Sequence, residues 1–177
     1  SPISPPNGGI TATAINGGLS TTINLHHATA RYNSNKEATM THNTQPMVGI
    51  IGGMGIDAGV LMVQKIRDLA GASSEQLQPR TILMSDPTVP DRTAFVLKEG
   101  PSPIPKLVAL SEQLVSAGAN VLVMACNTAH SPEILNPVLS SSSRPFISMI
   151  TAVINQLPES AVRVGIMATD GTLASSV

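Results

Sequence analysis

The sequence contains little cysteine, little charge and few aromatic residues. Cys126 is the single cysteine among 177 residues, which excludes a disulfide within the chain and any metal site built from several cysteines. Charged residues make up 12% of the chain and the formal net charge is -1, so no basic surface would attract nucleic acid or an acidic membrane. We therefore expect a small-molecule partner and no metal.

Long apolar runs are also missing. No stretch approaches the roughly 20 apolar residues that span a bilayer, and the N-terminus lacks the charged start and apolar block of a secretory signal. His26 and His27 are adjacent rather than at helical spacing, which favours solvated linker residues over metal ligands. A lone cysteine suits a reducing compartment, so we expect a cytoplasmic protein without a membrane partner.

Residues 1–46 are rich in Ser, Thr, Asn, Gly and Pro, and their few apolar residues follow neither a strand nor a helix period. Such a segment buries too little apolar surface to offset the entropy of ordering it. We predict a disordered extension over 1–46.

Short apolar runs alternate with helical patterns from Met47 onward. Runs that are apolar throughout and separated by helices indicate parallel strands covered on both faces. The predicted class is α/β, with a doubly wound parallel sheet like that of flavodoxin. Strands are expected at 48–51, 81–84, 121–124, 146–149 and 163–167, and helices at 56–70, from 104 to the stop at Gly118, and from about Pro132.

The pattern Val48-Gly49-Ile50-Ile51 leading to Gly55 returns as Val164-Gly165-Ile166-Met167 leading to Gly171. This repeat predicts a first α/β domain over 47–158 and the beginning of a second, truncated one over 159–177. Ligands of such sheets bind beyond the carboxyl ends of the strands. We therefore expect the loops at 52–56, 85–93, 125–131 and 168–172 to converge on one crevice.

The first two of these loops contain candidate ligand-binding residues. The run 53–58, Gly-Met-Gly-Ile-Asp-Ala, formally fits a dinucleotide fingerprint, but Asp86 comes too late to be its acidic partner. A plain tight turn is one alternative, and a turn that accepts a small carboxylate is the favoured one. In the second loop, Arg92 either grips a carboxylate or forms a solvated surface pair with Asp91, which the loop alone slightly favours.

Cys126 ends the third apolar run and is followed by Asn127-Thr128-Ala129-His130. A lone cysteine in such a place is more often a small core residue. Here, however, the sulfur would lie at the carboxyl end of a strand just before a helix N-terminus, where backbone N–H groups favour a thiolate. Asn127 and Thr128 would add donors for an anion, and His130 would either orient the site or cap the helix.

Three strings, in this order, carry a resemblance to a known family. Residues 49–55 (GIIGGMG), 90–93 (PDRT) and 126–130 (CNTAH) resemble the first half of aspartate/glutamate racemases, particularly the aspartate racemase branch. The likeness runs from about Met47 to Val177 and includes residues 168–172 (ATDGT). Ile56 and Ala125 stand where relatives have proline, which changes local stiffness rather than chemistry.

The resemblance implies two similar, pseudo-symmetric α/β domains with an amino acid, aspartate or glutamate, between them. It implies no cofactor, in particular no pyridoxal phosphate, and it leaves a homodimer open. Carried over by position, Cys126 becomes a catalytic thiol. The residues facing the substrate would be Met54, Arg92, Thr93, Asn127 and Thr128.

Racemisation without a cofactor needs a thiolate and a thiol on opposite sides of Cα, because one removes the proton and the other returns it. The second family cysteine is not among the 177 residues. We therefore expect an incomplete and inactive fragment of a racemase. The alternatives are another cysteine-pair enzyme of this fold, such as a maleate isomerase or hydantoin racemase, and a non-catalytic fragment that binds dicarboxylates.

Overall fold

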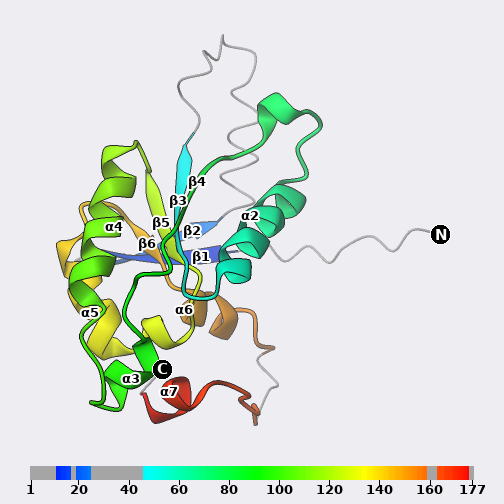
Figure 1. Ribbon diagram of the computed structural model, residues 1–177. Helices are drawn as coiled ribbons and strands as arrows, with labels where there is room; N and C mark the ends of the chain where they lie inside the picture. Colours follow the sequence, from blue (N-terminus) through cyan, green and yellow to red (C-terminus); the bar gives the residue numbers. More distant parts are fainter. Residues whose placement is uncertain (1–10, 17–18, 25–45, 159–162, 176–177) are drawn as a thin grey trace.

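Four parallel strands form the centre of the molecule. The computed structural model describes residues 11–16, 19–24, 46–158 and 163–175 (Figure 1). Strands β3 (Met47–Gly52), β4 (Arg80–Ser85), β5 (Val121–Met124) and β6 (Phe146–Ile147) lie in the order β4-β3-β5-β6. Every pairing among these four is parallel, which confirms the predicted α/β class.

Helices cover both faces of this sheet. The first is α2 (Ile56–Ala70), on one face, and on the other are α4 (Ile104–Ser116) and α5 (Pro132–Ser141) (Figure 1). Side chains alternate along a strand, so Ile50 packs with residues of α2 while its neighbour Ile51 packs with residues of α4 and α5. Burial on both faces explains why the central strands are apolar throughout.

The remaining elements are short. They are the 3₁₀ turns η1 (Glu75–Leu77) and η2 (Thr128–His130) and the helices α3 (Arg92–Val96), α6 (Met149–Ile154) and α7 (Asp170–Ala174). All of them except η1 lie at or near the carboxyl ends of the parallel strands (Figure 1). None of the described helices is long and apolar enough to cross a membrane.

Two strands fall within the segment expected to be disordered. Strands β1 (Thr11–Asn16) and β2 (Leu19–Asn24) pair antiparallel with each other, and β1 also pairs antiparallel with β6. The expectation for 1–46 is therefore wrong for these residues, and the rest of the segment before Pro46 lies outside the described residues. The overlooked signal is Gly17-Gly18 between two runs with β-branched residues, which is typical of a hairpin.

The strand predicted at 163–167 is wrong as well. Residues 163–169 have no regular structure, and Val164, Ile166 and Met167 are exposed by 56%, 68% and 101%. A strand exists only where another strand pairs with its backbone, and apolar composition does not supply that partner. The division into domains at 47–158 and 159–177 stays a prediction.

Gly53 makes the turn after β3 possible. Its φ of 87° lies in the region that favours glycine, and a Cβ at this position would overlap with the backbone of Asp86. The backbone N–H of Asp86 also donates to the carbonyl of Gly52, at 3.5 Å. The loop after β4 therefore lies directly against the turn after β3.

This contact predicts an unequal response to two Gly→Ala substitutions. Gly71 also has a positive φ, 56°, but no atom lies within 4 Å of an added Cβ, so Gly71→Ala should cost only about 1–2 kcal/mol of backbone strain. Gly53→Ala adds a steric overlap and should lower the free energy of unfolding by at least twice as much. Urea unfolding of both variants measures the difference, and equal losses would show that the loop around Asp86 is not packed here.

Candidate functional site

The site lies at the point where the order of the strands in the sheet reverses. From β3 the chain moves to β4 on one side, and then crosses back to β5 on the other side of β3. At such a switch point the loops after the two adjacent strands separate and leave a crevice at their carboxyl ends. The glycine turn follows β3 and Cys126 follows β5, so both border this crevice.

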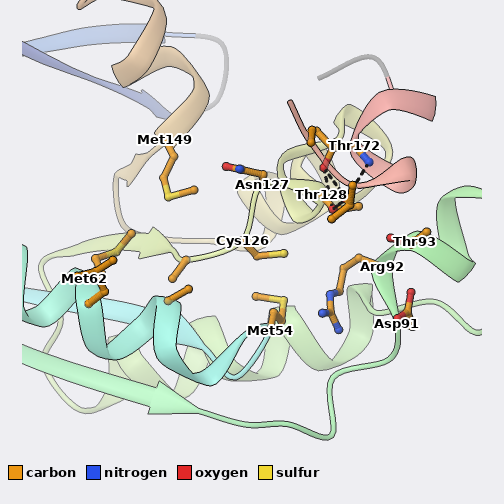
Figure 2. A pocket seen from close by; sticks show the side chains of 15 residues that line it. Met54, Met62, Asp91, Arg92, Thr93, Cys126, Asn127, Thr128, Met149 and Thr172 are labelled. Carbon is orange, nitrogen blue, oxygen red and sulfur yellow. Dashed lines mark hydrogen bonds between the residues drawn. The ribbon is translucent and has the colours of Figure 1, made fainter. Parts of the chain in front are cut away.

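A pocket of about 800 Å³ occupies the crevice (Figure 2), within the range usual for small-molecule sites. It is lined by residues from all four loops expected to converge, which confirms that expectation. Every predicted site residue lines it, namely Met54, Arg92, Thr93, Cys126, Asn127 and Thr128. Their roles in binding or catalysis stay predictions.

Cys126 is half-buried at the end of β5, and Figure 2 shows Cys126, Met54 and Arg92 directed into the same space. The preceding residue is fixed, because the N–H of Ala125 donates to the carbonyl of Ile51 at 3.0 Å. The residues after Cys126 differ from expectation. They form the single 3₁₀ turn η2, and α5 begins only at Pro132, so the thiol does not stand directly before an α-helix.

Arg92 is the first residue of α3 rather than part of an open loop. Asp91 is the N-cap, and its carboxylate accepts a hydrogen bond from the N–H of Ala94 at 2.8 Å. Nη1 of Arg92 donates to the carbonyls of Val89 and Pro90, at 3.2 and 3.0 Å, while its buried Nε has no hydrogen-bond partner within the described chain. Asp91 and Arg92 are therefore not a surface pair, and Arg92 lines the pocket while its Nε is enclosed by the protein.

Three threonine hydroxyls form a closed triangle on the pocket wall. Oγ1 of Thr128 lies 3.0 Å from that of Thr169 and 2.8 Å from that of Thr172, and the last two are 3.1 Å apart (Figure 2). Thr169 is the N-cap of α7, so the triangle ties α7 to η2. Gly171 completes this wall, because an added Cβ would overlap with Thr93 of α3.

Asp86 holds the loop after β4 and does not line the pocket. Its carboxylate accepts hydrogen bonds from the N–H and hydroxyl of Thr88, at 2.9 and 2.6 Å, and pairs with Lys106 at 2.8 Å. The hydrogen bond from Lys106, followed by those from Thr88, lowers the pKa of Asp86 to about 2. Since these partners occupy the carboxylate, Asp86 is not placed as the ribose-binding acid of a dinucleotide site.

His130 packs against the backbone of Cys126 and is only 4% exposed. Its Nδ1 is 2.7 Å from the backbone oxygen of Cys126, and its Nε2 accepts a hydrogen bond from the N–H of Met149 at 3.1 Å. Burial lowers the pKa of His130, and the bond to Cys126 opposes that shift in part. Of the two sequence alternatives, the ring does not cap α5, whose N-cap is Ser131.

Sequence reasoning missed part of the pocket lining. Met149 follows β6 and should have been found by the rule of strand ends, but the predicted strand ran two residues too far and enclosed it. Ala58, Leu61 and Met62 come from α2 and carried no signal, because their positions fit an ordinary amphipathic helix.

Comparison with known proteins agrees with this architecture. The family model described as Asp/Glu/Hydantoin racemase matches residues 51–177. The chain belongs to this family.

Two solved structures are similar to part of the chain. One is the aspartate racemase of Picrophilus torridus, with 33% identity and a TM-score of 0.53 over 59% of this chain and 44% of that protein. The other is an aspartate racemase homologue from Pyrococcus horikoshii, with 21% identity and a TM-score of 0.51 over 63% of this chain and 48% of that protein. The second likeness concerns the fold alone. The racemase-family chain spans less than half the length of these relatives.

Burial of His130 predicts a loss of stability in mild acid. Because its pKa is lower in the folded chain than the ordinary 6.5, the unfolded chain takes up a proton first as the pH falls. The contribution of His130 to the free energy of unfolding is complete above about pH 6.5. Below that pH it declines, by at most about 1.4 kcal/mol per pH unit, until the pH falls past the pKa of His130 in the folded chain.

Urea unfolding at pH 7.5 and at pH 5.5 measures this loss. In His130→Asn the decline between the two pH values should be smaller, because the substituted side chain does not titrate. An equal decline in both proteins would show that His130 is not the group responsible.

Proposed function

We propose that this chain supplies one half of the active site of an amino-acid racemase that uses two thiols and no pyridoxal phosphate. The observation that carries the proposal is the position of Cys126, the single thiol of the sequence, in the pocket at the switch point of the sheet. Arg92 and the threonine triangle line the same pocket. The chain spans less than half of the solved relatives, so the activity of the whole protein is part of the proposal.

In the proposed reaction the thiolate of Cys126 takes the proton from Cα on one face of the amino acid. The electron pair left on Cα delocalises into the carboxylate, and a thiol on the opposite face donates a proton to Cα. The product is the other enantiomer, with one thiol and one thiolate exchanged. The 177 residues contain one cysteine, so the second thiol would come from outside them.

Donors around the carboxylate would stabilise the charge that develops on it. Arg92, which lines the pocket, supplies a guanidinium for this purpose, and the hydroxyls of Thr128 and Thr172 become donors to a ligand when the triangle opens.

Aspartate is the first substrate to test, because the 33% identical structure is an aspartate racemase. Hydantoin racemisation is a second candidate, since the description of the matching family names it as well. Both reactions remove a proton next to a carbonyl group, so the same thiol would act in both.

The isolated chain should not interconvert L- and D-aspartate or glutamate measurably. Loss of one base from such a mechanism costs about 10²–10⁴ in rate, and the opposite wall of the site is missing as well. Joining the chain to the second half of the Picrophilus torridus racemase should create activity, measured as interconversion of the enantiomers in deuterated water.

Three variants of the joined protein test the roles of individual residues. Cys126→Ser should abolish interconversion, and Arg92→Gln should raise KM by about tenfold or more through loss of a charge-assisted hydrogen bond. Arg67→Gln is the matched control, because Arg67 is an exposed residue of α2 paired with Asp68. Activity of the isolated chain that survives Cys126→Ser would overturn the proposal, whereas binding of dicarboxylates without interconversion in the joined protein would favour the non-catalytic alternative.

A further inference from the structure

His130 connects two walls of the pocket without lining the pocket itself. Its ring joins the backbone of Cys126, at the end of β5, to the backbone of Met149, at the start of α6. Both of these residues line the pocket. The imidazole packs in the core, where it meets the ring of Phe146 edge-on at 6.5 Å between centroids. Neither the proposed proton transfer nor the proposed carboxylate binding uses this group.

The two hydrogen bonds define the protonation of the ring. A carbonyl oxygen only accepts, so Nδ1 must carry the hydrogen that points to Cys126. The N–H of Met149 only donates, so Nε2 must be bare. His130 is therefore the neutral imidazole with its proton on Nδ1, and burial of the ring favours the same neutral form.

The bond to Cys126 fixes the direction of a peptide group at the site. The described chain contains no cis peptide bond, and in a planar trans peptide the C=O and the following N–H point in opposite directions. Because the carbonyl of Cys126 points at the buried His130, the N–H of Asn127 points away from the core. Within the described residues this N–H has no backbone acceptor, and Asn127 is an exposed pocket residue.

We infer that His130 is a positioning residue, which holds the Cys126–Asn127 peptide so that the Asn127 N–H serves as a fixed donor to negative charge beside the thiol. The inference rests on the proposed function, since it takes Cys126 as the reacting group. A fixed N–H next to sulfur favours the thiolate, which is the reactive form of cysteine. The hydrogen bond from Met149 keeps the ring of His130 in place, and the hydrogen bond to Cys126 holds the Cys126–Asn127 peptide in its orientation.

Two variants of the full chain separate these bonds. Asn places an N–H near the position of Nδ1 and should keep the bond to Cys126, whereas Gln places an acceptor near Nε2 and should keep only the bond from Met149. Alkylation of Cys126 by iodoacetamide at pH 7 is the readout, with Cys126→Ser as the unlabelled reference. We expect His130→Asn to react at the wild-type rate and His130→Gln to react about fivefold more slowly, the effect of one net hydrogen bond.

Phe146→Leu is the control for a merely structural role. It removes the ring contact of His130 but neither hydrogen bond, so it should lower the thermal midpoint and leave the alkylation rate unchanged. Equal rates in wild type, His130→Asn and His130→Gln would overturn the inference, and so would equal slowing of both variants.

A spectrum of the wild-type chain gives an answer even if a variant fails to fold. In ¹⁵N-labelled protein the imidazole of His130 should be neutral with its proton on Nδ1, and a proton on Nε2 would overturn the inference. Neither measurement needs a substrate. If alkylation is slowed in His130→Gln but the joined protein does not racemise, the positioning role stands and the proposed function is rejected. If alkylation is not slowed but the joined protein racemises, the proposed function stands and the positioning role is rejected.

Discussion

The parallel pairing of β3 with β5 is the constraint on which the pocket depends. Ile51 stands opposite Met124, both side chains are fully buried, and the N–H of Ala125 continues the pairing to the carbonyl of Ile51. A slip of one residue would exchange the two faces of a strand and bring core side chains into the wrong layer. The packing of the core thus fixes how the glycine turn and the Cys126 loop stand relative to each other.

Outside the sheet, a few polar contacts rather than apolar packing hold the loops around the pocket. Asp91 caps α3, Asp86 is bound by Thr88 and Lys106, and His130 joins the Cys126 loop to α6. In a loop at the end of a strand, the backbone N–H and C=O groups have no neighbouring strand to pair with. Side chains therefore have to supply their hydrogen-bond partners. A chain with only 12% charged residues places several of its charged and polar groups at these positions, where each fixes the geometry of a pocket wall.

The wall made by α7 was expected from the sequence, but the strand predicted before it does not form. This wall contacts α3 through Gly171 and Thr93, and η2 through the threonine hydroxyls, although the residues before it form no strand. The loop at 168–172 therefore reaches the pocket through side-chain and helix contacts rather than as the continuation of a strand. The proposed two-thiol reaction needs a further wall, because bases on opposite faces of one carbon cannot both come from a single cysteine.

The sequence by itself determined the parallel α/β core, because apolar runs mark buried strands. It also placed Arg92, Cys126 and two residues after the cysteine, Asn127 and Thr128, at the edge of the sheet that borders the pocket, because polar clusters after such runs mark that edge. Met54 and Thr93 were predicted only through the family resemblance. The sequence did not determine the strands β1 and β2, the absence of a strand at 163–167, or the place of Met149, since strand pairing depends on which partner lies alongside. Only the tertiary structure decided that Arg92 binds the carbonyls of Val89 and Pro90 and that His130 binds the backbone of Cys126. Those two facts depend on the direction of single side chains, which packing and hydrogen bonding set after the fold is formed.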